Sequence, residues 1–114
     1  MQYLLTLYAD EGQWHGTPEG EMQKIMAAYR AYIEALKQAR VLVNFNRLQT
    51  KAATVRVADG KSHVQDGPFI DSKEQVGGYF LIETPDLDAA ISWAARCPGA
   101  GHGTVEVRPV WAMA

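Results

Sequence analysis

A helix-opening pattern that occurs twice constrains the fold of this chain more than any other feature of its sequence. The segments TPEGE (17–21) and TPDLD (84–88) each combine a threonine, a proline and early acids, which suit the first turn of a helix. In the first segment Thr17 is the expected cap, and the proline after it is the first helical residue. Apolar residues follow at helical spacing, so helices are predicted to run to Arg40 and to about Arg96.

Apolar segments on either side of the two helices are predicted to be strands. They span residues 2–9, 41–48, 78–83 and 104–110. The order strand-helix-strand therefore occurs twice. It predicts a ferredoxin-like α+β fold, in which an antiparallel sheet carries two helices on one face. Between the halves, residues 53–57 and 62–65 form a predicted hairpin around Asp59-Gly60, a dipeptide suited to a type I′ turn.

The first strand is apolar on both of its faces, and this bears on assembly. Alternate residues from Tyr3 to Leu7 point to one side, and those from Leu4 to Tyr8 point to the other. Two helices cover only one face of such a sheet. A second copy of the sheet is expected to cover the other face, so the sequence predicts a homodimer built face to face.

Size and charge exclude several classes of protein. The 114 residues suffice for one domain, which is expected to span 1–114. A net charge of −2 gives no basic surface for nucleic acid, and no apolar run is long enough to cross a bilayer. The start of the chain lacks the pattern of a signal peptide, and the single cysteine, Cys97, is expected to be an inert thiol in a reducing compartment. These features predict a cytoplasmic protein with no nucleic-acid or membrane partner.

The densest group of signals is the segment QDGPFIDSKEQVGGYF, for which two interpretations stay open. In the first it is a structural corner, where Asp66 closes an Asx turn and Phe69 anchors the loop in the core. Residues 71–74 then form a capping box on a single helical turn. In the second interpretation, Asp66, Lys73 and Glu74 gather beside the apolar interior as groups for acid-base chemistry.

This segment resembles the signature of the YCII-related proteins, in the branch named for its Asp-Gly-Pro-Phe motif. The motif corresponds to residues 66–69, followed by the Asp-Ser-Lys-Glu segment at 71–74, which matches Glu-Thr-Lys-Glu in that branch, and by the Gly-Gly-aromatic strand at 77–79. The segments MQYLLTLYADE, DLDAAISWAARCP and VEVRPV also resemble the start, the second helix and the last strand of that branch. The resemblance implies a ferredoxin-like domain that dimerises into an α+β barrel and whose activity is largely unassigned. Some relatives are encoded beside alternative sigma factors, which implies a sigma factor as a partner to consider.

Histidines in this chain depart from the wider family. Shorter YCII proteins carry a His-Asp pair proposed as catalytic, with the histidine in the first helix, whereas this chain has no histidine from Met22 to Arg40. That pair is therefore not carried over, and Arg40 stands where the family usually has glycine. His15, His63 and His102 lie far apart without metal-ligand spacing, and the GAGHG segment is expected to be a flexible turn. No metal and no cofactor is predicted.

Polar side chains outside the corner offer further candidates for substrate binding. Glu106 and Arg108 share one face of the last strand, either as an ion pair or as the lining of a polar pocket. Tyr8 and Tyr79 either supply hydroxyls to such a pocket or pack in the core. The candidates for substrate binding are Phe69, Tyr79, Arg108 and Tyr8.

Two functions of different classes fit these observations. The first is a small cofactor-free enzyme that acts on an organic acid or aromatic molecule in a cleft between sheet and helices. Asp66 or Glu74 would be the base, Lys73 or Arg108 would hold an anion, and Tyr79 would donate a hydrogen bond. The alternative is a non-catalytic dimeric module that binds a metabolite or a protein such as a sigma factor. A catalytic base must be reachable from a cavity, whereas a capping acid bonds to backbone amides.

Overall fold

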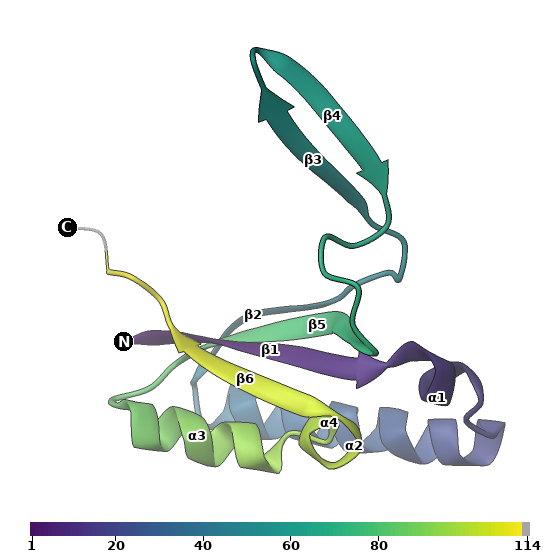
Figure 1. The fold of residues 1–114 in the computed structure, drawn as a ribbon. Coiled ribbons are helices and arrows are strands. Elements are labelled where there is room, and N and C mark those ends of the chain that lie inside the picture. Colours follow the sequence, from purple (N-terminus) through teal and green to yellow (C-terminus); the bar gives the residue numbers. More distant parts are fainter. Residues whose placement is uncertain (113–114) are drawn as a thin grey trace.

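The computed structural model describes residues 1–112 and shows a sheet with helices on one face (Figure 1). Its strands are β1 (Gln2–Asp10), β2 (Leu42–Arg47), β3 (Ala53–Ala58), β4 (Lys61–Asp66), β5 (Glu74–Glu83) and β6 (Thr104–Pro109). Its helices are α1 (Glu11–His15), α2 (Glu19–Gln38), α3 (Leu87–Arg96) and α4 (Gly99–His102). The main sheet has the order β2-β5-β1-β6 and is antiparallel throughout, with α2 and α3 on one face. The predicted ferredoxin-like α+β fold is thereby confirmed.

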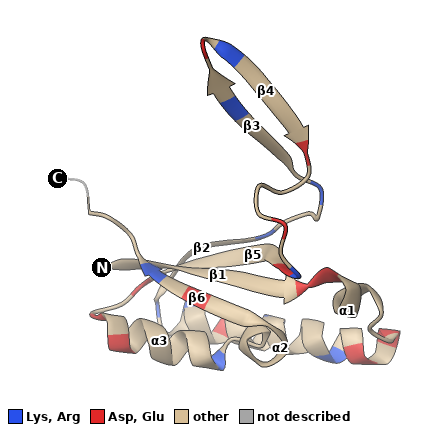
Figure 2. Cartoon of the chain, in the orientation of Figure 1, with Lys and Arg blue, Asp and Glu red and all other residues tan. Residues whose placement is uncertain are grey.

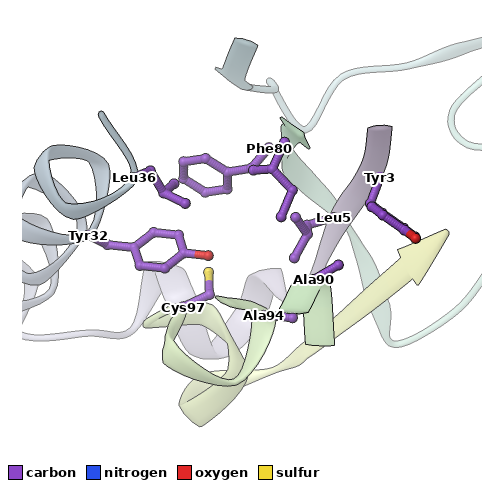
Figure 3. Packing of buried hydrophobic residues seen from close by; sticks show 9 residues of the cluster. Tyr3, Leu5, Tyr32, Leu36, Phe80, Ala90, Ala94 and Cys97 are labelled. Atoms are coloured by element: carbon purple, nitrogen blue, oxygen red, sulfur yellow. The ribbon is translucent and has the colours of Figure 1, made fainter. Parts of the chain in front are cut away.

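The core lies between the sheet and the two longer helices (Figure 3). Alternation along β1 turns Tyr3 and Leu5 toward the helices, where both are buried. The ring of Tyr32, from α2, meets Phe80 of β5 edge-on with ring centroids 5.2 Å apart. The Tyr32 hydroxyl donates a hydrogen bond to the carbonyl of Trp93 on α3 at 2.8 Å. One aromatic side chain therefore ties both helices to the sheet.

The two helix-opening patterns fold differently. The second pattern opens α3 at Leu87, but its cap is Asp86 and not the threonine, because the Asp86 carboxylate accepts a hydrogen bond from the Ala89 amide at 2.9 Å. The prediction that Thr17 caps α2 is wrong. That helix begins at Glu19 without a side-chain cap, and the Thr17 hydroxyl donates to the carbonyl of Gln13 at 2.9 Å instead. The threonine is engaged by the helix before it and is not available to the helix after it.

Two segments predicted to be irregular are short helices. Asp10 ends β1 and also caps α1, because its carboxylate accepts from the amides of Gly12 at 2.9 Å and Gln13 at 3.4 Å. The GAGHG segment forms α4, which ends at His102, so the expectation of a flexible turn is wrong. Both short helices contact β1. They close the same end of the sheet, where the cavity described below lies.

The β3–β4 hairpin projects from the sheet face that carries no helix (Figure 1). Asp59 and Gly60 have φ of 51° and 74°, which confirms the type I′ turn. The strands pair only with each other, and Val55, Val57 and Val64 are 61%, 65% and 66% exposed. The radius of gyration is 16.2 Å, compared with about 13 Å for a compact chain of this length. The hairpin is an arm that stands clear of the core of its own chain.

The corner between β4 and β5 contains no helical turn, so the predicted capping box is wrong. The side chain of Gln75 closes the corner by donating to the carbonyls of Ile70 at 3.1 Å and Ser72 at 2.6 Å. Glu74 already belongs to β5, where it pairs with Asp10 of β1. Because Glu74 is paired within the sheet, it cannot reach back to the backbone as the capping box requires.

Charged residues lie on the outer surfaces of the helices, along the hairpin, at strand ends and on β6 (Figure 2). The two central strands of the sheet, β1 and β5, carry acids only at their ends, at Asp10, Glu74 and Glu83. On the face without helices, Leu4 and Leu81 lie opposite each other and are only partly buried. On that face the central strands are therefore uncharged and partly apolar, while β6 places Glu106 and Arg108 beside Thr6 and Leu4.

Candidate functional site

A cavity of about 250 Å³ lies between α2 and the sheet, at the end where β1 meets α1. Its walls are largely apolar and draw on several elements. The apolar lining includes Leu7, Trp14, Met26, Ile33, Phe45 and Phe80. A concave, mostly apolar site with a small number of polar groups is the usual form of a small-molecule site in proteins.

Aromatic rings give this cavity flat walls. Phe45 of β2 lies opposite Phe80 of β5, and their rings are stacked at 5.7 Å with an angle of 19° between planes. Tyr29 of α2 lies nearly parallel to the same Phe80 ring, 7° from it, at a centroid distance of 6.5 Å. The ring faces favour contact with a flat apolar molecule.

Two glycines allow the elements around the cavity to approach closely. A Cβ at Gly78 of β5 would lie 2.9 Å from the carbonyl oxygen of Asn46 on β2. A Cβ at Gly99 would lie 2.6 Å from the hydroxyl of Tyr29 and 3.2 Å from Leu7. Larger residues at these positions would push β2 and α4 away from the cavity, so the glycines set its shape.

Polar side chains also line the cavity, among them Glu11, Tyr29, Arg47 and His102. The guanidinium carbon of Arg47 lies 5.2 Å from the centroid of the Trp14 ring, at cation–π distance. Arg47 is the last residue of β2, and Trp14 comes from α1. The end of a strand and a short helix together place a cation on an aromatic wall.

Burial keeps two groups near the cavity protonated. It raises the pKa of the Tyr29 hydroxyl well above its ordinary value, and the neighbouring Cys97 raises it further. The positive charge of Arg47 acts in the opposite direction and lowers the pKa of Tyr29. Burial also raises the pKa of the Cys97 thiol. Near neutral pH the thiol is a poor nucleophile, and the Tyr29 hydroxyl remains a hydrogen-bond donor.

Two of the predicted binding residues, Tyr8 and Tyr79, form part of the cavity wall. The Tyr79 hydroxyl accepts hydrogen bonds from the side-chain amides of Asn44 at 3.2 Å and Asn46 at 2.8 Å. Because Phe80 points into the core, alternation along β5 turns the Tyr79 side chain to the face without helices. Its hydroxyl is therefore engaged on that face.

The three residues predicted to be catalytic do not line the cavity. Lys73 lies 3.8 Å from the carboxylate of Asp10, and the Glu74 carboxylate accepts from the Thr104 hydroxyl at 3.3 Å. Asp66 ends β4, is exposed and pairs across the hairpin with Ala53. Lys73 and Glu74 thus lie at the end of the sheet face that carries no helix, and Asp66 lies at the base of the hairpin.

The other two predicted binding residues also lie outside the cavity. Phe69 is 69% exposed, so the expectation that it anchors the loop in the core is wrong. The guanidinium of Arg56 lies 5.8 Å from its ring centroid. Arg108 forms an ion pair with Glu106 at 2.9 Å, which is one of the two alternatives that the sequence allows.

Sequence reasoning missed the residues that line the cavity mouth. Trp14 lies between the predicted first strand and first helix, where no element is predicted, and His102 lies in the segment predicted to be a flexible turn. Arg47 and Tyr29 were assigned to a strand and to a helix without any role. The available signal was Asp10, since aspartate favours the cap position of a helix. A short helix that begins after Asp10 carries Trp14.

Residues 1–112 contain neither a metal-binding cluster nor a membrane-spanning helix. In that range, no three His, Cys, Asp or Glu side chains lie close enough to hold a metal ion. No helix in the same range is long and apolar enough to cross a membrane.

Three comparisons relate the chain to known proteins. An uncharacterised protein of Rhizobium meliloti (strain 1021) is 36% identical over 118 residues, covering 96% of this chain and 92% of its own. A 5-chloro-2-hydroxyhydroquinone dehydrochlorinase from Burkholderia phenoliruptrix AC1100, solved with 2,5-dihydroxybenzoquinone, shares the fold with a TM-score of 0.52 at 20% identity. That match covers 97% of this chain and 94% of the dehydrochlorinase. Residues 1–114 match the YCII-related domain, and the chain belongs to the YCII-related family.

Proposed function

We propose that the chain is a cofactor-free enzyme that binds a small, planar organic molecule in the cavity between α2 and the sheet. One observation carries the proposal: an apolar cavity of about 250 Å³ has stacked aromatic walls and ionisable side chains at its mouth. A dry apolar cavity of about 150 Å³ already suffices to bind benzene. The space therefore suits a single substituted ring.

Proton transfer is the chemistry that the lining residues support. His102 and Glu11 line the cavity, and imidazole and carboxylate are the groups that most often move protons in enzymes. Tyr29 keeps its proton because its pKa is raised, so it suits the role of hydrogen-bond donor to a developing oxyanion. The shared fold of the dehydrochlorinase, which was solved with a dihydroxybenzoquinone, supports the choice of a flat oxygenated ring as the first probe.

The residues of the Asp-Gly-Pro-Phe corner have an architectural role in this proposal. Asp66, Lys73 and Glu74 lie outside the cavity lining, and the latter two contact Asp10 and Thr104. Asp66→Asn keeps the turn-forming side chain and removes only its charge. We therefore expect this variant to bind and turn over a ligand as the parent does, and a loss of about a hundredfold would return Asp66 to a catalytic role.

A pair of variants on α2 tests the location of the site. Met26 lines the cavity, whereas Met22, one turn earlier on the same helix, does not. Met26→Trp is expected to fill the cavity and abolish the thermal shift caused by 2,5-dihydroxybenzoquinone. Met22→Trp, the matched control, is expected to keep that shift. If Met26→Trp folds and still binds the probe as the parent does, the cavity is not the site.

We also propose that the chain forms a homodimer through the sheet face without helices. The supporting observations are Leu4 and Leu81 on that face and the valines of the projecting hairpin. We propose likewise that the chain belongs to the Asp-Gly-Pro-Phe branch of its family and lies in the cytoplasm. Sedimentation at micromolar concentration should give about twice the mass of one chain. A stable monomer would contradict the dimer and favour the alternative function, in which these surfaces bind a different protein such as a sigma factor.

A further inference from the structure

We infer that the cavity selects planar molecules carrying an anionic oxygen group, a carboxylate or a phenolate, which Arg47 binds from its position on the Trp14 ring. This inference rests on the proposed function and adds the charge of the ligand to it. It makes Arg47 the residue that determines specificity at the cavity mouth.

The first argument is that Arg47 is a cation without an acidic partner. Within residues 1–112, no carboxylate oxygen lies within 4.0 Å of its guanidinium nitrogens. Glu11 is the acid among the cavity-lining residues, and it too is unpaired with Arg47. The guanidinium is therefore free to accept an anion from a ligand.

The second argument is that the positive charge of Arg47 acts on a group that lines the cavity, the Tyr29 hydroxyl. It favours the ionised form of the Tyr29 hydroxyl, in opposition to burial. A positive charge that favours an anion at the position of Tyr29 favours an anionic group of a ligand in the same space.

The third argument concerns geometry. The guanidinium lies over the Trp14 ring at 5.2 Å, and stacking of this kind holds the planar group in place while its edge remains available. Arginine presents a fork of N–H donors that matches a carboxylate, and charge-assisted hydrogen bonds are stronger than neutral ones. A ligand ring on the Phe45 and Phe80 wall and an anionic group at Arg47 would use both features at once.

Matched probes separate this inference from the proposed function. Benzoate and benzyl alcohol share a ring and differ in charge, and titration calorimetry measures the binding of each. Wild-type protein is expected to bind benzoate at least about tenfold more tightly than benzyl alcohol, as one charge-assisted contact implies. Arg47→Met keeps the apolar stem and removes the charge, so it should lose that difference. Arg30→Met, at an exposed position of α2 outside the cavity, is the control and should keep it.

The outcomes are distinguishable. If benzyl alcohol binds wild-type protein as tightly as benzoate, the inference is overturned while the proposed function stands. If neither of these probes nor 2,5-dihydroxybenzoquinone binds, both fail together. Should Arg47→Met fold poorly, the salt dependence of the wild-type protein decides: added salt should weaken benzoate and spare benzyl alcohol. Equal salt dependence of the two probes would contradict a role for Arg47.

Discussion

Arg40 occupies a backbone position that normally suits glycine. It follows the end of α2 with φ of 60°, and the amides of Arg40 and Val41 bond to the carbonyls of Lys37 at 3.0 Å and Leu36 at 3.1 Å. These two bonds form a Schellman motif with arginine at its left-handed position. Glycine adopts this backbone conformation without strain, whereas the arginine holds it at an energetic cost.

Replacing that arginine should therefore stabilise the protein. Arg40→Gly is expected to raise the free energy of unfolding by about 1 kcal/mol, the relief of left-handed strain less the entropy that glycine adds to the unfolded chain. Urea unfolding measures the change. Ala39→Gly, one residue earlier at φ −75°, is the control and should destabilise instead. Equal or lower stability of Arg40→Gly would show that the position carries no strain.

The buried tyrosines predict how stability depends on pH. Burial raises the pKa of Tyr29 and Tyr32 above their ordinary value of 10.0, so the folded chain holds protons that the unfolded chain releases. Their contribution is complete below about pH 10 and is lost as the pH rises further. Tyr32→Phe should lower stability at neutral pH, because it removes the bond to Trp93, and should flatten the alkaline decline. Urea midpoints between about pH 8 and 11 test this, and an unchanged alkaline slope would contradict it.

At the scale of elements, the adjacent glycines of β5 provide a matched pair. A Cβ at Gly78 would lie 2.9 Å from the Asn46 carbonyl, whereas a Cβ at Gly77 would meet nothing within 4 Å. Gly78→Val should therefore cost about 2 kcal/mol by forcing β2 and β5 apart. Gly77→Val should cost less, and thermal unfolding compares the two. Equal melting temperatures would show that close approach of the strands does not require Gly78.

The elements that the sequence predicts correctly are those specified by local signals. The Asp59-Gly60 turn fixes the hairpin, and the TPDLD pattern predicts the opening of α3, although the residue that caps it is Asp86. The capping box predicted between β4 and β5 is wrong because Glu74 belongs to β5. There it pairs with Asp10, which lies far away in sequence. Because the corner contains no capping box, Asp71→Ala is expected to leave the melting temperature nearly unchanged.

At the scale of the whole molecule, the cavity could not be predicted from the sequence. Its lining comes from β1, α1, α2, β2, β5 and α4, and only the sheet order β2-β5-β1-β6 brings these elements to one end. The sequence identifies Tyr8 and Tyr79 as candidates only because each offers a hydroxyl that a polar pocket could use. Trp14 and Arg47 meet at 5.2 Å although 33 positions separate them in the chain (47 − 14), so no motif or spacing could pair them.

The central claim is that a planar ligand occupies this cavity, and the indole signals of the three tryptophans test it most directly. Trp14 lines the cavity, Trp93 packs on the core from α3, and Trp111 is 87% exposed. Two-dimensional NMR of isotope-labelled protein, titrated with 2,5-dihydroxybenzoquinone, reports on all three. We predict that the Trp14 indole and the backbone amides of Gly78 and Gly99 shift together, while Trp111 does not move. Shifts confined to the hairpin or to the sheet face without helices, with Trp14 unchanged, would contradict the claim.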